Sequence, residues 1–414
     1  MATIPQQVDA PLDGKVSKAA VEPPPCVRFG PVPRGNDVGP HGEQPLTVGT
    51  IAPSYGLEHV SYGVPVPAVT FCTLQAISAR RFETRSQFFA HTPAVIGPRV
   101  DLIHSFNHLP LQVPRRRPFV VSCEMELPRI LGQPADWQKQ FALKALSKES
   151  CRRILPLSEA AQRFISRRFK AANHPHLDHK MDVFRGAVTP PAMLRPPRDI
   201  KQPIRFLFVG GDGLRKGLGV AVDAVQRLNA GGIEASLTVI GRPTAESYAM
   251  PGRSLPTNTL YAVLDETPFI EHHASLPNSE VRRRMAEADF LLFPTVDESL
   301  GWVVIEAGLT GLATAATEIF AIPELIDHES SGWLLSTDTD EDGRWLHLAT
   351  SAAPDEWEAL QKGLSDQIVG FAEAIARNPH LPDQMGDAAR RKLEALYLPE
   401  VAAARLRAIY DAAL

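Results

Sequence analysis

Between residues 204 and 316, short apolar runs alternate with segments of helical spacing. The runs lie at 204–209, 235–240, 268–270, 290–293 and 312–316, and helices are expected at 218–230, 279–288 and 302–309. Strands buried on both faces are nearly continuous apolar runs, and helical crossovers join parallel neighbours. The alternation therefore predicts an α/β domain with a mostly parallel sheet.

A second group of apolar runs lies upstream of residue 160. The expected strands are 46–51, 66–71, 101–106, 118–124 and 154–158, with helices at 135–146 and 159–169. Ser158 is placed to cap the second helix with its hydroxyl. Helical segments return from residue 355, and the last, 399–414, carries an apolar face with Leu406 and Ile409.

Proline-rich sequence marks the expected boundaries in this chain of 414 residues, a length that suggests two domains or more. Residues 1–45 hold nine of the 37 prolines and no periodic apolar pattern, which predicts a disordered tail. Prolines between Thr189 and Arg198 predict the linker. We therefore expect a first domain at 46–197, a second at 198–385, and further helices at 386–414.

No apolar run reaches the roughly 18 residues needed to span a bilayer. Residues 1–13 lack the basic start and apolar centre of a signal peptide. The four cysteines are scattered without metal-ligand spacing: Cys26, Cys72, Cys123 and Cys151. Reduced thiols are typical of the cytoplasm, so we expect a cytoplasmic protein with no metal site.

The net charge of -4 hides an asymmetry between the two halves. Residues 46–200 hold 21 Lys and Arg against 11 Asp and Glu, whereas residues 201–414 hold 18 against 31. Arg163, Arg167, Arg168 and Lys170 lie on one expected helix, and Arg80–Arg81 and Arg115–Arg117 add to the count. The basic half suggests an anionic partner, such as the lipid headgroups of the inner membrane face, which the protein would contact peripherally. The alternative is a solvated surface whose charges have no specific partner. We expect no nucleic-acid partner.

The stretch from Asp297 to Glu306 follows an apolar strand and carries two glutamates. Eight steps along one continuous helix would leave Glu298 and Glu306 about 80° out of register. They can converge if Glu298 lies in a loop and Glu306 on the second turn of a helix that starts near Gly301. Backbone amides from Gly301 to Val304 would then point at an anion. The alternative is a buried structural strand, since Trp302 to Ile305 are β-branched or aromatic.

A second motif runs from Val209 to Gly217 and places Arg215 and Lys216 between glycines, just before an expected helix. Glycine allows a phosphate to approach the backbone, and the two cations suit phosphate oxygens. The order Lys216–Gly217 excludes a Walker A loop, and Lys216 stands where a Rossmann fingerprint needs glycine. A plain glycine turn with surface cations remains the alternative.

Together the two motifs resemble those of the retaining nucleotide-sugar glycosyltransferases of the GT-B fold, glycosyltransferase family 4 (group 1). The stretch from Glu298 to Glu306 resembles the E-x7-E motif of that family. Residues 210–217 resemble its phosphate loop, in the variant with arginine beside the lysine. Segments at 286–289, 322–326 and 331–335 follow the family in order and spacing. The resemblance covers most of residues 100–414.

The resemblance implies two Rossmann-like domains facing across a cleft, with a C-terminal helix packing back on the first domain. It implies catalytic roles for Glu298, which would hold the donor sugar, and for Lys216 and Arg215, which would neutralise the leaving diphosphate. The implied donor-binding residues are Gly211, Leu300, Gly301, Trp302, Val303 and Glu306, the last on the ribose hydroxyls. No metal ion and no cofactor beyond the nucleoside diphosphate sugar are expected.

The chain departs from the family on the acceptor side. Where the family often has His-Asp, this sequence has Glu124 and Glu126, and either could receive an acceptor proton. The glycine-rich loop after the first strand has one candidate, residues 49–63. His104 is expected to be an interior residue rather than a catalyst. His272–His273 lacks ligand spacing and is not expected to bind a metal ion.

The function that follows is transfer of a hexose from a nucleoside diphosphate sugar to an acceptor hydroxyl with retention of configuration. The acceptor could be a carbohydrate, a lipid-linked group or a protein. The alternative is a non-catalytic paralogue that binds nucleotide sugars and acts in a complex. A dinucleotide oxidoreductase is a third possibility, which the missing Rossmann fingerprint disfavours.

Overall fold

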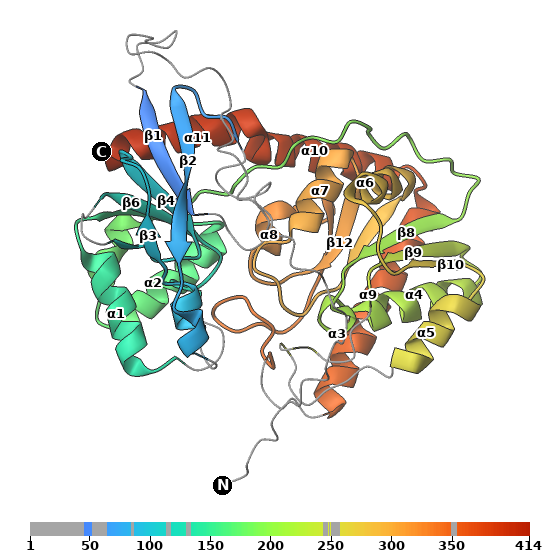
Figure 1. The fold of residues 1–414 in the computed structure, drawn as a ribbon. Coiled ribbons are helices and arrows are strands. Elements are labelled where there is room, and N and C mark those ends of the chain that lie inside the picture. The colour runs from blue at the N-terminus through green and yellow to red at the C-terminus, as the bar shows by residue number, and fades with distance from the viewer. Residues whose placement is uncertain are drawn as a thin grey trace, which may run out of the picture.

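The computed structural model describes residues 45–51, 64–83, 87–112, 117–129, 134–242, 247, 249, 257–348 and 354–414. The expected tail, almost all of the glycine-rich loop candidate, and Arg115 and Arg116 lie outside these residues. The described chain forms two α/β units, each built on its own sheet (Figure 1). Within the described ranges, no helix combines the length and apolar character needed to cross a membrane.

The first sheet has seven strands in the order β5-β3-β2-β1-β4-β6-β7. Neighbouring strands are parallel except β2 and β3, which are antiparallel. The strands are β1 (Leu46–Ile51), β2 (Val69–Ile77), β3 (Ala94–Ile96), β4 (Leu102–Phe106), β5 (Leu111–Gln112), β6 (Phe119–Cys123) and β7 (Cys151–Pro156). The helices are η1 (Arg80–Phe82), η2 (Phe88–Ala90), α1 (Asp136–Ser147), α2 (Glu159–Ala171) and η3 (Pro175–Lys180).

The second sheet has six parallel strands in the order β10-β9-β8-β11-β12-β13. Its strands are β8 (Ile204–Val209), β9 (Ala235–Ile240), β10 (Ile270–His273), β11 (Phe290–Phe293), β12 (Ala313–Thr317) and β13 (Gly332–Leu335). Its helices are α3 (Gly213–Lys216), α4 (Leu218–Ala230), α5 (Thr257–Glu266), α6 (Asn278–Glu287), α7 (Trp302–Thr310), α8 (Ile322–Leu325) and α9 (Pro354–Arg377).

Alternate residues of these strands face opposite layers, as the period of a strand requires. Phe206 and Phe290 pack in the cluster with α4 and α9. Leu207 and Leu291 pack in the other cluster, with α7. Burial on both faces explains the continuous apolar runs, so the predicted parallel α/β domain is confirmed.

The C-terminal helices α10 (Leu381–Tyr397) and α11 (Pro399–Ala413) extend from the second unit back to the first (Figure 1). Leu406 and Tyr410 of α11 pack with Val48 and Leu102, which belong to the first sheet. The predicted crossing of the C-terminal helix is therefore confirmed. His104, fully buried, is hydrogen-bonded to Tyr410 at 2.7 Å and to Ser122 at 2.8 Å, and its burial lowers its pKa to about 3. The structure confirms the expected interior role of His104.

Several short elements differ from the sequence expectations. The strand expected at 66–71 is β2, which starts at Val69, because Pro67 cannot donate a ladder hydrogen bond and Ala68 has a φ of 54°. The strand expected at 268–270 is β10, Ile270–His273. The sequence analysis also missed β3, β5, β13, α3, α5 and α8, most of which have four residues or fewer and too short a pattern to give a periodic signal.

A buried carboxylate ties the linker to the second sheet. Asp289, just before β11, is 0% exposed and forms ion pairs with Arg195 (3.1 Å), Arg198 (3.2 Å) and Arg205 (2.9 Å). Burial alone raises the pKa of Asp289, but the hydrogen bonds and charge of Arg205, together with Arg195, outweigh burial and lower the pKa below its ordinary value. Asp289 is therefore ionised and fixes both the linker and β8.

We predict that Asp289→Ala lowers the free energy of unfolding by about 3–5 kcal/mol, because it leaves three cations without their buried partner. Urea unfolding at pH 7 measures this loss. Asp366→Ala, which removes a carboxylate from an exposed pair with Arg227, is the control and should cost far less. Equal losses in the two variants would contradict the role of Asp289.

The difference in unfolding free energy between wild type and Asp289→Ala should depend on pH. The pKa of Asp289 is lowered on folding, so its stabilisation is present above its unfolded pKa and is lost as the pH falls through the folded pKa. The stability difference between wild type and Asp289→Ala should therefore shrink below about pH 4.

Candidate functional site

The loop after β8 forms a compact turn that places two cations. Asp212 caps α3 by accepting from the Arg215 backbone N–H at 3.3 Å, and it also accepts from Arg215 Nε at 3.1 Å. Ser247 Oγ donates to the same carboxylate at 3.0 Å. The sequence analysis did not assign a role to Asp212, although aspartate before a short helical turn is a common cap. Asp212 thus fixes the direction of the Arg215 side chain.

Gly217 brings this loop against the end of the neighbouring strand β11. It has a φ of 77°, and a Cβ at this position would lie 2.1 Å from the Pro294 carbonyl oxygen. The Val296 N–H donates to the Arg215 carbonyl at 2.8 Å, which adds a second backbone contact. β8 and β11 are adjacent parallel strands, so their carboxyl ends meet at one edge.

That edge brings together the three residues predicted to be catalytic. Lys216 Nζ contacts Glu298 Oε2, and Arg215 Nη1 lies 3.9 Å from the same oxygen. Arg215 Nη1 also donates to the Asp297 carbonyl oxygen at 2.6 Å. The Lys216 ammonium lies 4.6 Å from the centre of the Phe293 ring, a cation–π contact that the sequence analysis missed.

Both members of the central pair are largely buried, with 13% of the Lys216 side chain and 12% of the Glu298 side chain exposed. Burial raises the pKa of Glu298, but the charge and hydrogen bond of Lys216 and the charge of Arg215 outweigh burial and hold the pKa below its ordinary value. Burial lowers the pKa of Lys216, and the charge of Glu298 opposes that effect. Arg215 and Lys216 thus both lie beside the Glu298 carboxylate, and Arg215 is also paired with Asp212.

The stretch that carries Glu298 and Glu306 contains a helix despite its β-branched residues. Glu298 lies in the loop, Gly301 has a φ of 93°, and α7 starts at Trp302. Glu306 is half-buried on the second turn of α7, where it lines a small pocket with Arg282 of α6 and Thr189 of the linker. The strand alternative for this stretch is therefore wrong.

The amides of this stretch are only in part arranged as expected. The Ser299 N–H donates to Glu298 Oε1 at 3.2 Å, and a backbone hydrogen bond from Leu300 also lowers the Glu298 pKa. The Val304 N–H donates to the Gly301 carbonyl at 2.9 Å, so its expected role toward an anion is wrong.

The other predicted donor-binding residues differ in exposure. Leu300 is buried, whereas Trp302 and Val303 are half-buried and pack against the core. Gly211 is exposed, and a Cβ there would meet nothing within 4 Å.

The carboxyl edge of the first sheet holds a separate polar cluster. Asn107 Nδ2 donates to Glu124 Oε2 at 3.3 Å, and Arg129 pairs with the same carboxylate at 3.2 Å. The rings of His91 and His108 lie 4.9 Å apart. Burial, followed by the nearby charges of His108, Arg129 and Arg80, lowers the pKa of His91 to about 4. The sequence analysis named Glu124 but missed Asn107, His91 and His108. Asn107 and His108 could have been found from their position just after β4, whereas His91 follows η2.

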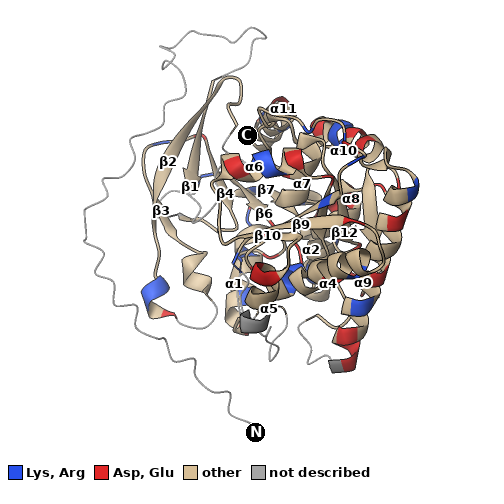
Figure 2. Ribbon diagram, turned by 90° about the vertical axis from the view of Figure 1, so that its right-hand side faces the viewer, with Lys and Arg blue, Asp and Glu red and all other residues tan. Residues whose placement is uncertain are grey.

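Glu126 points to a different place from Glu124, because it pairs with Arg168 at 3.4 Å. Arg167 forms an ion pair with Asp342, and Lys170 lies 3.6 Å from Asp178. Three of the four cations expected on the basic helix are thus paired within the chain, which reduces the charge that α2 offers to a partner. Acidic and basic residues are likewise interspersed along α6, α9 and α10 (Figure 2).

The adjacent histidines lie at the end of β10 and have protein partners. His272 Nε2 is 3.1 Å from the Gly241 carbonyl, and His273 Nε2 is 2.9 Å from Glu271 Oε1. In the part of the chain that the structure describes, no group of three or more His, Cys, Asp or Glu side chains is arranged to hold a metal ion.

We predict that Gly217→Ala destabilises the protein more than Gly232→Ala does, by about 1–3 kcal/mol. Both glycines have positive φ values, 77° and 85°, so both variants carry similar backbone strain. Only position 217 adds a clash with Pro294, whereas a Cβ at 232 meets nothing within 4 Å. Urea unfolding of the two variants gives the difference, and equal stabilities would show that the contact between the two loops is unimportant.

Residues 203–343 match the glycosyl transferases group 1 family. The chain is 32% identical to the amylovoran biosynthesis glycosyltransferase AmsK of Erwinia amylovora over 162 residues. The aligned segment covers 37% of this chain and 38% of that protein. It is 25% identical over 208 residues to a D-inositol 3-phosphate glycosyltransferase of Corynebacterium kroppenstedtii, covering 45% of each. The matched segments therefore span less than half of either relative.

Two solved structures show the same fold. A glycosyltransferase from Rickettsia africae aligns with a TM-score of 0.59 at 13% identity, over 90% of this chain and 99% of that one. Anabaena HepE in complex with UDP aligns with a TM-score of 0.53 at 13% identity, over 75% and 79%. Residues 203–343 thus resemble the glycosyl transferases group 1 family, within a chain that has the two-domain GT-B fold.

Proposed function

We propose that this protein transfers a hexose from a nucleoside diphosphate sugar to an acceptor hydroxyl, with retention of anomeric configuration. The observation that carries the proposal is the Lys216–Glu298–Arg215 cluster at the carboxyl edge of the second sheet. In this proposal the donor domain spans residues 198–385 and the acceptor-side domain spans 46–197. Residues 386–414 join the two.

The cluster suits a reaction in which a diphosphate leaves. The leaving group gains negative charge while the sugar ring gains positive charge. Lys216 and Arg215 would place two cations beside the diphosphate, in a site with little exposure to water, while Asp212 holds Arg215 in position. Fixed cations in such a site stabilise a developing anion more strongly than they would in bulk water. Lys216 and Arg215 would thus stabilise the leaving diphosphate.

The remaining residues would position the donor. Glu298 would turn from Lys216 toward hydroxyls of the sugar once the diphosphate engages the lysine. The open space beside Gly211 would admit phosphate oxygens, since no side chain fills it. Gly301, Trp302 and Val303 at the start of α7 would face the diphosphate, and Leu300 would hold Glu298. Glu306 would accept hydrogen bonds from the ribose.

The similar proteins suggest the substrates. The HepE structure contains UDP, which favours a UDP-hexose as donor. AmsK is named for the biosynthesis of amylovoran, which favours an acceptor that belongs to a growing polysaccharide or glycolipid. The other relative is named for a phosphorylated acceptor, D-inositol 3-phosphate. We propose an anionic or lipid-linked acceptor, used by a cytoplasmic enzyme in peripheral contact with the inner membrane face.

A non-catalytic paralogue is the second candidate. It is favoured by the acceptor edge, where Glu124 is held by Asn107 and Arg129 at the position where the family often has His-Asp. Such a protein would bind the nucleotide sugar without turnover.

We predict that one nucleoside diphosphate raises the melting temperature. At about a hundred times its dissociation constant, one-site binding adds roughly 2.7 kcal/mol of stability. This corresponds to a rise of several degrees for a domain of this size. UDP, GDP and ADP are tested separately by thermal unfolding, and UDP is expected to give the largest shift. No shift with any of the three would remove the basis for a donor site.

We predict that Glu298→Gln lowers turnover of the UDP-hexose about a hundredfold or more, because it removes a charge beside the reacting carbon. UDP release measures turnover, and Glu373→Gln on the exposed side of α9 is the matched control. Proton NMR of the product should show that the anomeric configuration of the donor is kept. UDP binding without turnover in the wild type would favour the non-catalytic paralogue, and an inverted product would contradict retention.

A further inference from the structure

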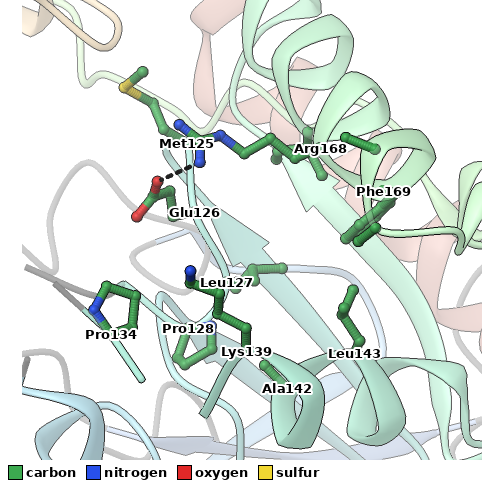
Figure 3. Close-up of a pocket in the computed structure, with 13 residues that line it drawn as sticks. Met125, Glu126, Leu127, Pro128, Pro134, Lys139, Ala142, Leu143, Arg168 and Phe169 are labelled. Atoms are coloured by element: carbon green, nitrogen blue, oxygen red, sulfur yellow. Dashed lines mark ion pairs between the residues drawn. The ribbon is translucent and has the colours of Figure 1, made fainter. Parts of the chain in front are cut away.

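The first domain contains a cavity of about 350 Å³ between α1, α2 and the loop after β6 (Figure 3). This volume falls within the range of small-molecule pockets, about 300–1,000 Å³. The cavity is separate from the Lys216–Glu298 cluster, which belongs to the second domain. None of its lining residues has a role in the donor chemistry proposed above.

The walls of the cavity are mostly apolar. Leu127 and Pro128 come from the loop, Ala142 and Leu143 from α1, and Ile165 and Phe169 from α2. Ala142, Ile165 and Phe169 are buried, so these walls are part of the domain core rather than of a mobile surface. A cavity of this composition favours an aliphatic chain over a sugar ring, because it offers few partners for hydroxyl groups.

The mouth of the cavity is charged. Arg168 pairs with Glu126 at 3.4 Å, and the side chain of Lys139 extends from α1 into the space below that pair (Figure 3). More than half of each cationic side chain is exposed, 58% for Arg168 and 54% for Lys139. Lys139 in turn lies 3.4 Å from Asp136, an exposed carboxylate on the first turn of α1. A phosphate at the mouth would therefore take the two cations from exposed ion pairs, which are weak.

The cavity lies beside the acceptor edge of the fold. Its loop continues from β6, where Glu124 lies, and its second helix begins at the contact between the two domains. There, Glu324 of α8 accepts from the α2 backbone N–H groups of Glu159 at 3.1 Å and of Ala160 at 2.7 Å. The cavity itself is lined by the second half of the same helix, from Ile165 onward.

The other face of α1 provides an independent observation. Trp137 is 55% exposed and its ring contacts Phe88, with ring centres 5.4 Å apart; Phe141 lies 5.8 Å from the same ring. Phe82 is 72% exposed and lies under Arg81, whose guanidinium is 4.8 Å from the ring centre. Exposed aromatic rings with arginine beside them are typical of a surface that rests at a membrane interface. The cavity thus lies next to a surface from which a lipid could enter.

We propose that the cavity binds the hydrocarbon chain of a lipid phosphate, with the phosphate held by Lys139 and Arg168, and that this lipid carries the acceptor group. The inference rests on the proposed glycosyltransferase function and names its acceptor class. The apolar walls would select the chain, and Lys139 and Arg168 would turn from their exposed carboxylate partners to hold the anionic head. The transferred sugar would then extend a group anchored by its lipid to the first domain.

Decyl phosphate, kept below its critical micelle concentration, is the probe for this site. Isothermal titration calorimetry with the full chain should show binding at least tenfold tighter than that of 1-decanol or of inorganic phosphate. If 1-decanol binds as tightly, the cationic mouth has no role. If inorganic phosphate binds as tightly, the apolar cavity has none. Either result, or no binding of decyl phosphate, overturns the proposal.

Two variants locate the binding. Ala171 is an exposed residue at the rim, so Ala171→Phe should block the cavity without disturbing the core, and Lys139→Glu should repel the head. Each is expected to weaken decyl phosphate binding at least tenfold. The matched controls are Ala404→Phe on the exposed side of α11 and Lys144→Glu on α1, both expected to stay within twofold of wild type. Unchanged binding in Ala171→Phe would overturn the assignment.

The thermal shift with UDP separates this test from that of the proposed function. Ala171→Phe and Lys139→Glu should keep the full UDP shift, because the donor residues lie in the other domain. A UDP shift without decyl phosphate binding would overturn the lipid site and leave the glycosyltransferase proposal intact. Decyl phosphate binding without a UDP shift would contradict the proposed donor site. It would then also contradict the proposal that the lipid carries the acceptor group.

Discussion

The arrangement of the Lys216–Glu298 cluster, the proposed donor site, depends on one buried carboxylate, Asp289. It lies immediately before β11, and its ion pair with Arg205 fixes the position of β8 relative to β11. The carboxyl ends of these same two strands carry Lys216 and Glu298. Because strands are stiff and only a few residues long, fixing their amino ends also fixes where their carboxyl ends meet. The Lys216–Glu298 contact is therefore set from the opposite edge of the sheet, by residues that no substrate touches.

Close backbone approach is the second condition for this site. At Gly217 a side chain would collide with Pro294, and at Gly241 a Cβ would lie 2.1 Å from the Gly210 carbonyl oxygen. The loops after β8, β9 and β11 thus pack directly against one another, with no side chains between them. Such packing holds the cations at fixed positions, which is what electrostatic stabilisation of a leaving anion requires. Asp212 adds to this rigidity by binding Arg215 on the side away from Glu298.

The sequence was sufficient where a pattern was long or a residue type was chemically constrained. The apolar runs of β8, β9 and β11 and the helical spacing of α4 predicted the second sheet, and the resemblance predicted that Glu298 and Glu306 lie on loop and helix. The partners of Glu124 could not be predicted, because Asn107 and Arg129 reach it through tertiary structure rather than through local spacing. The basic character of α2 was similarly misleading, since Arg167 and Arg168 have acidic partners that are distant in sequence.

The helix α2 explains why the two halves of the molecule act together. One side of α2 faces the second domain, where Phe164 contacts Phe320 with ring centres 6.1 Å apart and Arg167 pairs with Asp342. Its N-terminus receives the carboxylate of Glu324, which satisfies two amides and complements the helix dipole. An adjoining side, with Ile165, Arg168 and Phe169, forms a wall of the cavity in the first domain. Because a helix moves as a rigid body, a displacement of α2 at the domain contact must also change the cavity. The two domains are thus in contact through a single helix, α2, while α11 packs on the first sheet from the other end of the chain.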